Sequence, residues 1–348
     1  MQISDGNDKV WMQRALDLAK LADGQVFPNP YVGAVLVHRN RIIGEGWHQR
    51  AGGAHAERIA LEGIPEEVAM ESTLYVTLEP CSHYGKTPPC APYVVEKRVK
   101  RVVIATEDPN HLVAGRGIAY LQDRGVLLRT GVLSEEARRL NRRFFTYHQQ
   151  RRPYVILKWA QTLDGIIGIR GQRLPVSNEI VNILVHRWRS REHAVLVTDH
   201  TIHNDNACLT VRHWPGYQPW RVVFATRPRV PLPVAFQQQK VPTLIFNATE
   251  TNPPISNVSS SQHKIASIRR VLDWLYQRQI VSVMVEGGAS LLRSWILSDM
   301  WDEIRLIVSE TTVGQGIPSP SFNGVCVARY VVDDNHIFIF KNHQNRYL

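Results

Sequence analysis

The first half of the chain is built around two stretches, His55-Ala56-Glu57 and Pro80-Cys81-Ser82-His83-Tyr84-Gly85-Lys86-Thr87-Pro88-Pro89-Cys90. One imidazole and two thiolates are typical ligands of a tetrahedral zinc ion whose fourth position is open to water, which is the arrangement of a catalytic site. His55, Cys81 and Cys90 are therefore the predicted metal ligands. Glu57 is the predicted catalytic residue, because a carboxylate that lies beside such a metal without binding it can transfer protons.

Strand ends and helix starts are predicted to bring these ligands together. His55 begins a helical stretch, the β-rich residues 73–78 lead into Cys81, and Cys90 begins another helix. Both metal-binding segments would then lie at the carboxyl ends of strands, where α/β sheets place their ligands. The partial positive charge at a helix N-terminus favours an ionised Glu57.

The length of 348 residues indicates two domains, because a single core rarely serves more than about 300 residues. Strand-like and helix-like segments alternate in both halves, which predicts α/β domains. The last element of the first half is a predicted helix over residues 134–147. Arg151-Arg152-Pro153 then interrupts the pattern, since the residue before a proline disfavours helix. The predicted domains are residues 1–150 and 151–348.

The net charge of +10 is unevenly distributed. Residues 1–150 hold 19 Lys and Arg against 17 Asp and Glu, and residues 151–348 hold 22 against 14, so +8 of the charge is in the second half. A basic excess fits a site for phosphorylated small molecules or for nucleic acid. No aromatic side chains are interleaved with the basic clusters as a base-stacking platform would need, so we expect a phosphorylated small molecule and no nucleic acid.

No stretch has the roughly 18 uninterrupted apolar residues of a membrane span. The first residues also lack a basic segment followed by an apolar one, which is the pattern of a secretion signal. We therefore expect a cytoplasmic protein with no membrane partner.

The second half contains a turn that is suited to phosphate. A predicted strand, residues 282–285, leads through Glu286-Gly287-Gly288 into a predicted helix, residues 289–297. Glycines between a strand and a helix let a ligand approach the backbone, and the helix N-terminus offers free N–H groups. Such a turn can also be only a tight connection.

Two further segments of the second half carry predictions. A helix is expected from Ser177 or Asn178 to Arg189, with an apolar stripe that consists of Ile180, Ile183, Leu184 and Trp188. Residues 199–208, with Thr201 and Asp205, are expected to form a polar loop after a strand over residues 194–198.

Four stretches of the first half resemble the bifunctional riboflavin-biosynthesis deaminase/reductase family. They are Pro28-Asn29-Pro30 with Val32-Gly33-Ala34, Gly44-Glu45-Gly46-Trp47-His48, the segment Thr77 to Cys90, and Asp108-Pro109-Asn110 followed by Val113-Ala114-Gly115-Arg116-Gly117. Zinc nucleobase deaminases usually separate the two cysteines by two residues, whereas this chain and the family have eight. The resemblance implies that Asn29, His83 and Lys86 contact the substrate.

The second half resembles the reductase part of the same family at Leu157-Lys158, Leu163-Asp164-Gly165, Leu209-Thr210-Val211-Arg212 and Val285-Glu286-Gly287-Gly288. The implied fold is α/β throughout: a cytidine-deaminase-like three-layer α/β/α domain followed by a dihydrofolate-reductase-like α/β domain. The resemblance implies NADPH as cofactor, with five contacting residues: Ala160, Thr201, Asp205, Gly287 and Gly288. It implies four substrate contacts in this half: Arg189, Leu209, Arg212 and Glu286.

The family's function would be two successive steps of riboflavin biosynthesis. The first removes an amino group from a diaminopyrimidinone that carries a ribosylamine phosphate, and the second reduces the ribosyl group to ribityl with NADPH. Leu174-Pro175, Thr198 and His200 replace residues that the family usually has near its cofactor. A second possible function is therefore that of a deaminase whose reductase-like domain has lost its activity.

Two more functions fit less of the chain. A deaminase that acts on RNA would leave the second domain unexplained, and a pure binding protein would have no need of Glu57. Whether the chain forms a homo-oligomer is left open.

Overall fold

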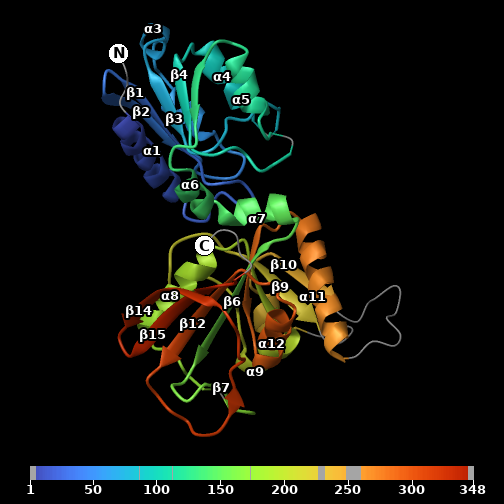
Figure 1. Ribbon diagram of the computed structural model, residues 1–348. Coiled ribbons are helices and arrows are strands. Elements are labelled where there is room, and N and C mark those ends of the chain that lie inside the picture. The colour runs from blue at the N-terminus through green and yellow to red at the C-terminus, as the bar shows by residue number, and fades with distance from the viewer. Residues whose placement is uncertain are drawn as a thin grey trace. The chain divides into compact units, whose positions relative to one another are not determined.

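The structure is a computed structural model that describes residues 5–85, 87–111, 113–172, 174–225, 232–247 and 260–343. The chain divides into two compact units, unit 1 within residues 1–150 and unit 2 within residues 151–346 (Figure 1). No helix among these described residues is long and apolar enough to cross a membrane.

Unit 1 has a five-stranded sheet in the order β2-β1-β3-β4-β5. Strand β1 pairs antiparallel with β2 and β3, and β3, β4 and β5 are parallel to one another. The elements of the unit, in chain order, are α1 (Asp5–Lys20), β1 (Gly33–His38), β2 (Arg41–Trp47), α2 (Ala56–Ala60), α3 (Glu66–Ala69), β3 (Thr73–Val76), α4 (Cys90–Glu96), β4 (Arg101–Ile104), α5 (Arg116–Gln122), β5 (Leu127–Thr130), α6 (Ser134–Leu140) and α7 (Arg142–Gln150).

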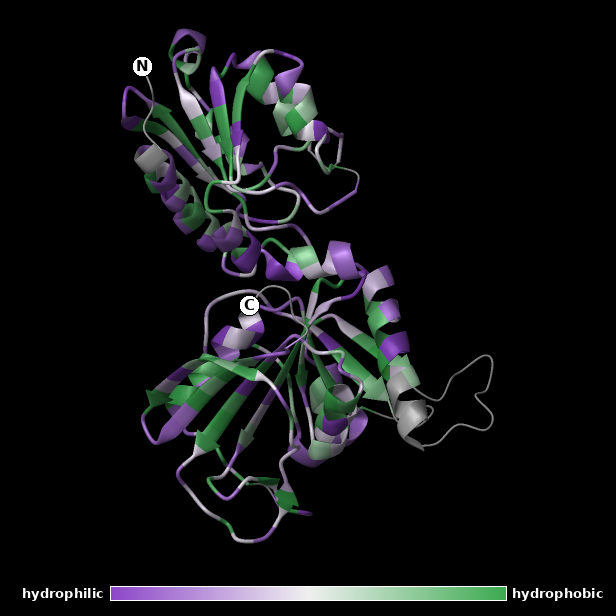
Figure 2. Ribbon diagram, in the orientation of Figure 1, coloured by the Kyte–Doolittle hydropathy of each residue, from purple (hydrophilic) through white to green (hydrophobic). Residues whose placement is uncertain are grey.

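Helices cover both faces of this sheet, which gives the three layers that the sequence predicts. Alternate strand residues enter two separate cores, because successive side chains of a strand point to opposite faces. Leu74 and Val102 pack with α2, α4 and α5, whereas Tyr75 and Val103 pack with α1 and α6. Figure 2 shows hydrophobic residues along the strands of the sheet, together with hydrophilic ones. The side of the sheet with α2 and α4 carries the predicted metal ligands.

Unit 2 has an eight-stranded sheet in the order β10-β9-β8-β11-β6-β12-β15-β14. The first six strands in this order are parallel, and β15 and β14 add two antiparallel strands at one edge. A second, two-stranded sheet is formed by β13 and β7. The elements are β6 (Tyr154–Gln161), β7 (Ile166–Gly168), α8 (Glu179–Ser190), β8 (Ala194–Thr198), α9 (Asp199–Asp205), β9 (Trp220–Ala225), α10 (Val234–Gln237), β10 (Thr243–Asn247), α11 (Ser260–Gln277), β11 (Ser282–Glu286), α12 (Ala289–Leu297), β12 (Glu303–Ser309), β13 (Ile317–Pro318), β14 (Val325–Val332) and β15 (Asn335–Lys341).

The large sheet of unit 2 also has a core on each face. Residues of α11 and α12, such as Leu272 and Trp295, pack on one face, and residues of α8 and α9, such as Val185 and Ile202, pack on the other. The parallel strands are buried on both faces, so they have continuous apolar sequences instead of an alternating pattern.

Two predicted elements differ from the structure. The predicted helix over residues 134–147 is two helices, because Asn141 is buried between them and its side chain hydrogen-bonds both the backbone N–H and the carbonyl of Tyr31. The predicted polar loop that contains Thr201 and Asp205 is the helix α9. Its cap explains the difference, since the Thr198 hydroxyl accepts a hydrogen bond from the backbone N–H of Thr201.

The predicted apolar stripe of α8 is half right. Trp188 is buried and Leu184 packs against the same core, but Ile180 and Ile183 are 56% and 41% exposed. The buried residues of the helix are Val181, Val185, His186, Trp188 and Ser190. The helix has apolar residues on two adjacent faces, and packing against the sheet selects between them.

Candidate functional site

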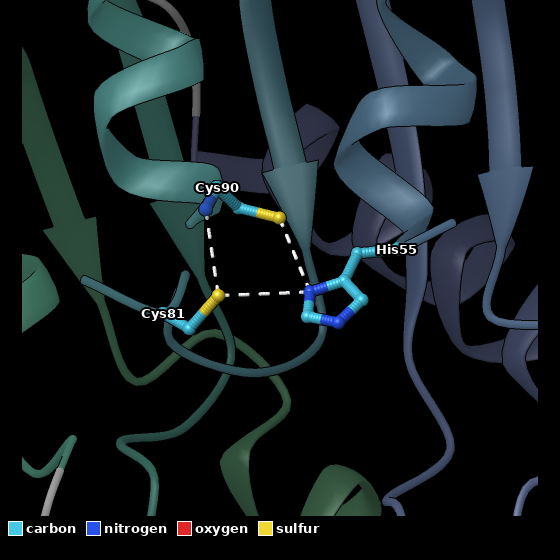
Figure 3. Close-up of side chains that lie close together, drawn as sticks. All are labelled: His55, Cys81 and Cys90. Carbon is cyan, nitrogen blue, oxygen red and sulfur yellow. Dashed lines mark hydrogen bonds between the residues drawn. The ribbon is translucent and has the colours of Figure 1, made fainter. Parts of the chain in front are cut away.

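Three side chains from separate elements meet in unit 1 (Figure 3). His55 is the N-cap of α2, Cys90 is the first residue of α4, and Cys81 lies on the segment that follows β3. The Nδ1 atom of His55 is 3.6 Å from the Sγ atom of Cys81 and 3.3 Å from the Sγ atom of Cys90. All three ligand atoms lie within 4.8 Å of one another, so they can bind one ion.

These separations fit a zinc ion. Zinc–sulfur and zinc–nitrogen bond lengths of about 2.3 and 2.0 Å place tetrahedral nitrogen and sulfur ligands about 3.5 Å apart. The Nε2 atom of His55 faces away from the sulfurs and lies 3.0 Å from the Thr87 hydroxyl oxygen. Such an outer partner fixes the ring of a metal-binding histidine, and Thr87 is not among the predicted site residues.

The two thiols favour different protonation states. Hydrogen bonding to Cys90, and then to His55, lowers the pKa of Cys81 despite its burial. The hydrogen bond to Cys81 and burial raise the pKa of Cys90. Cys81 is therefore the thiol of the pair that loses its proton more readily, and the thiolate is the form that binds a metal ion.

Glu57 lies in the first turn of α2, two residues after His55, and is only 3% exposed. Burial raises its pKa to about 7. A carboxyl group with a pKa near the working pH can both accept and give up a proton, which is what proton transfer needs.

Close packing of β2 holds α2 in this place. A Cβ atom on Gly46 would lie 2.4 Å from the carbonyl oxygen of Ala56, and one on Gly44 would lie 2.0 Å from that of Ala60. Only glycine allows the strand and helix backbones to approach so closely. The Gly-x-Gly spacing in β2 is thus part of the metal site's support.

His48, which is not among the predicted site residues, connects Asn29, a predicted substrate contact, to the predicted ligand His55. The ring centroids of His48 and His55 are 5.5 Å apart. The Nδ2 atom of Asn29 is 3.0 Å from the Nε2 atom of His48, and the His48 Nδ1 atom is 3.0 Å from the carbonyl oxygen of Ala54. A consistent arrangement has Nδ1–H of His48 donating to Ala54 and Nε2 accepting from Asn29. The signal in the sequence was the position of His48 directly after Gly46-Trp47.

The loop between the cysteines carries the other predicted substrate contacts. His83 and the neighbouring Tyr84 are exposed, so His83 is accessible to a ligand. Lys86 lies outside the described residues.

A buried glutamate before Cys81 ties this loop to the next segment of the chain. Glu79 is 4% exposed, and its carboxylate accepts hydrogen bonds from four backbone N–H groups, those of Asp108, Gly115, Gly117 and Ile118. A charged residue between a buried strand and a predicted ligand was the only sequence signal for this role.

In unit 2, predicted substrate residues from α8, from β11 and from residues 209–212 lie in contact with one another. Arg189 of α8 forms a bidentate ion pair with Glu286 at the end of β11, with both N–O distances 2.8 Å. Its Nη1 atom also donates to the carbonyl oxygen of Thr210 at 3.4 Å, and the Thr210 hydroxyl accepts from Arg212 at 2.9 Å. Arg189, Glu286 and Arg212 therefore belong to one cluster that is joined through Thr210, and Leu209 directly precedes Thr210 in the chain.

The charges of this cluster are set by their neighbours. Burial alone would raise the pKa of Glu286, but Arg189 lowers it to about 2. Lys158 of β6 is opposite Glu286 in the strand register, and burial lowers its pKa although Glu286 opposes the change. Lys158 belongs to a stretch that resembles the family, but it is not among the predicted site residues.

The predicted phosphate turn is present at the start of α12. Gly288 is the N-cap of this helix with no side-chain cap, and a Cβ atom on it would have no neighbour within 4 Å. The first N–H groups of the helix are therefore not capped by a side chain, and the backbone can be approached by a phosphate group. This geometry fits a dinucleotide such as NADPH.

The other predicted cofactor residues lie on β6 and α9. Ala160 is half-buried in β6, Thr201 is in the first turns of α9, and Asp205 ends that helix. The hydroxyl oxygens of Thr198 and Thr201 are 3.1 Å apart, and the Nε2 atom of His200 lies 2.9 Å from the Asn204 amide. Thr198 and His200, which differ from the family's usual residues, thus contact the side chains of Thr201 and Asn204 on α9.

Comparisons with known proteins agree with both sites. Residues 153–337, more than half of the chain, match the RibD C-terminal domain family, and residues 5–106 match the cytidine and deoxycytidylate deaminase zinc-binding region. The riboflavin biosynthesis protein RibD of Aquifex aeolicus is 39% identical over 318 residues, covering 89% of each chain. That of Bacillus amyloliquefaciens is 37% identical and covers 90% of this chain and 87% of its own.

Two solved structures have the same fold over nearly the whole chain. The diaminohydroxyphosphoribosylaminopyrimidine deaminase/5-amino-6-(5-phosphoribosylamino)uracil reductase of Thermotoga maritima is 34% identical with a TM-score of 0.85. RibD of Acinetobacter baumannii is 31% identical with a TM-score of 0.86, and each match covers 97% of this chain and 99% of the other. The predicted fold class is thereby confirmed. The chain belongs to the RibD family, as a riboflavin biosynthesis enzyme that joins a zinc-dependent deaminase to an NADPH-dependent reductase.

Proposed function

We propose that unit 1 deaminates 2,5-diamino-6-ribosylamino-4(3H)-pyrimidinone 5′-phosphate and that unit 2 then reduces the ribosyl group of the product to ribityl. The observation that carries this proposal is the convergence of His55, Cys81 and Cys90 beside the buried Glu57. The names of the Aquifex and Thermotoga relatives support the pathway and the two reactions.

The side chains of unit 1 have distinct roles in the deamination. His55, Cys81 and Cys90 would hold a zinc ion, which when bound supplies a Lewis acid that makes water a nucleophile near neutral pH. Glu57 accepts the proton of the attacking water on its carboxylate and delivers it to the departing amino group, which leaves as ammonia. Its raised pKa suits both transfers.

Substrate recognition in unit 1 would use polar groups around the metal ligands. Asn29 carries an amide that can bind the edge of a pyrimidine, and His48 holds it in one orientation. His83 and Lys86 belong to the loop between the two cysteines and would reach the ribose phosphate.

The side chains of unit 2 bind and orient, while NADPH supplies the hydride. Gly287, Gly288 and the start of α12 would bind cofactor phosphate through backbone N–H groups. Ala160, Thr201 and Asp205 would contact the remainder of the cofactor. Arg189, Leu209, Arg212 and Glu286 would contact the phosphorylated substrate, for which arginine is well suited.

One preparation of the full chain tests both halves of the proposal. Deamination is followed as ammonia release from the diaminopyrimidinone phosphate, and reduction as NADPH oxidation with the deaminated product supplied directly. We expect turnover in both assays. Ammonia release without NADPH oxidation would establish a deaminase with an inactive reductase-like domain, the alternative that the residues at 174–175, 198 and 200 suggest.

The proposed reactions use small phosphorylated metabolites and no nucleic acid or membrane. We accordingly place the enzyme in the cytoplasm, where NADPH and such metabolites occur.

A further inference from the structure

The segment Leu209–Arg212 of unit 2 is held in an unusual backbone conformation. Leu209 is 2% exposed and has a φ angle of +59°, in the left-handed region that side chains other than glycine seldom adopt. Such a conformation persists only when surrounding contacts enforce it, and the Leu209 side chain is packed in the core. The three residues that follow are held by side chains from outside the segment.

Helix α8 supplies two of these contacts from one face. His186 and Arg189 are three residues apart, so their side chains lie one above the other. The Nδ1 atom of His186 accepts a hydrogen bond from the backbone N–H of Arg212 at 3.0 Å, and Arg189 donates to the carbonyl oxygen of Thr210. His186 is 5% exposed, so little water competes for its bond.

Gln218 supplies the remaining two contacts. Its Oε1 atom accepts from the backbone N–H of Val211 at 3.0 Å, and its Nε2 atom donates to the Val211 carbonyl oxygen at 2.7 Å. One side chain thus pairs with both polar groups of a residue, as a neighbouring strand would. Residues 210, 211 and 212 each have a backbone group bonded to α8 or to Gln218.

The consequence of this arrangement is the placement of the Arg212 guanidinium. Arg189 is neutralised by Glu286, whereas in the described parts of the chain no carboxylate forms an ion pair with Arg212. Arg212 is exposed, and its guanidinium donates to the Thr210 hydroxyl. It is therefore the arginine of this cluster whose positive charge remains available to an anion.

We infer that His186 and Gln218 are positioning residues that fix Arg212 for the phosphate group of the reductase substrate. Neither side chain needs to touch the substrate. This inference rests on the proposed function, because it requires that Arg212 meets the phosphorylated substrate of unit 2.

The protonation state of His186 supports this role. Burial, and then the charges of Arg189 and Arg212, lower its pKa to about 4, with His213 adding to the effect and Glu286 opposing it. The ring is therefore neutral at working pH, and Nδ1 keeps the lone pair that accepts the Arg212 N–H.

The test compares a phosphorylated substrate with its dephosphorylated form. Reductase kcat and KM are measured for the deaminated ribosylaminopyrimidine phosphate and for the nucleoside obtained from it with phosphatase. In His186→Leu we expect KM for the phosphorylated form to rise about tenfold, equivalent to about 1.4 kcal/mol, with kcat and KM for NADPH within about twofold of wild type. The preference of the enzyme for the phosphorylated substrate over the nucleoside falls by the same factor. A loss of folded protein cannot cause this change, because it lowers the rates with both substrates equally.

Three further variants sharpen the comparison. His186→Asn places an amide oxygen where Nδ1 was and should restore the preference to within about threefold of wild type. Gln218→Met, at an exposed position, should weaken the preference even if His186→Leu does not fold. Val185→Ala removes a buried side chain from the neighbouring position of α8, so it should lower stability without changing the preference.

The outcomes separate this inference from the proposed function. If Arg212→Met lowers the phosphate preference but His186→Leu and Gln218→Met do not, the positioning role is refuted while the proposed function stands. An unchanged preference in Arg212→Met also refutes it, because Arg212 then does not bind the phosphate. No NADPH oxidation by the wild-type chain, with ammonia release intact, refutes both.

Discussion

Glu57 is buried and Glu286 is partly buried, and their carboxyl pKa values are shifted in opposite directions. In the described part of the chain no Lys or Arg forms an ion pair with Glu57, so burial raises its pKa to about 7. Glu286 is held by both nitrogen atoms of the Arg189 fork, and its pKa falls to about 2. The first can exchange protons near neutral pH and the second remains ionised, so only the first suits acid–base catalysis.

Replacing Glu57 with Gln should abolish deamination and leave the metal bound. The amide cannot transfer protons, so we expect kcat for ammonia release to fall by at least about a hundredfold. Zinc content, measured by metal analysis, should stay at one per chain because His55, Cys81 and Cys90 are unchanged. Loss of zinc from this variant would show that Glu57 is a ligand instead.

At the scale of elements, Glu79 acts as the N-terminal cap of α5. Two of its four hydrogen bonds come from Gly117 and Ile118 in the first turn of that helix, where N–H groups have no partner within the helix. A carboxylate there also interacts favourably with the helix dipole. The segment that follows β4 is thereby connected to the segment that carries Cys81.

Glu79→Gln should destabilise unit 1. The amide of Gln would turn an NH₂ group toward two of the four N–H donors, so two hydrogen bonds are lost. Charge-assisted hydrogen bonds contribute about 1.5–3 kcal/mol each. We therefore expect the free energy of unfolding to fall by about 3 kcal/mol. Glu66→Gln is the control, because Glu66 pairs with Arg98 at the surface, where a pair contributes about 1 kcal/mol or less. Equal effects in chemical unfolding would contradict the capping role.

At the scale of the whole molecule, each unit contains its own chemistry. All three predicted metal ligands belong to unit 1, and all predicted NADPH residues belong to unit 2. A chelator should therefore abolish ammonia release, which returns when zinc is added back. NADPH oxidation with the deaminated substrate should stay within about twofold of the untreated enzyme. A parallel loss of both activities would show that the units depend on one another.

The stability of unit 2 should decrease as the pH falls below about 6.5. Burial lowers the pKa of His186 and of His193 to about 4, from an unfolded value of 6.5. The unfolded chain therefore takes up protons first, and stability is lost as pH falls from 6.5 toward 4, by about 2 kcal/mol per histidine between pH 7 and pH 5.

Seven of the nine tryptophans lie in residues 151–348, so tryptophan fluorescence during urea unfolding reports mainly on this unit. His193→Asn should remove about half of the pH dependence; an unchanged dependence would exclude His193 as its source.

The metal site could be predicted from the sequence because its residues lie close together along the chain. His55 and Glu57 share one helical turn, Cys81 and Cys90 flank one loop, and their residue types are enough to specify zinc. The predicted metal ligands are brought together in the structure. The support of this site by Glu79 and Thr87 could not be predicted, since their partners are backbone and ring atoms that no residue type reveals.

The buried face of α8 could not be predicted from residue type and short spacing. Ile180 and Ile183 on one face are as apolar as Val181 and Val185 on the next, so the helical period alone does not choose between them. Contacts with strands far along the chain make the choice, and they bury His186 against Arg212. The sequence by itself was enough to predict the metal ligands, the catalytic role of Glu57 and the α/β class, because these predictions depend on residue type and short spacing. Only the tertiary structure decided which face of α8 turns inward, because that depends on packing between distant segments.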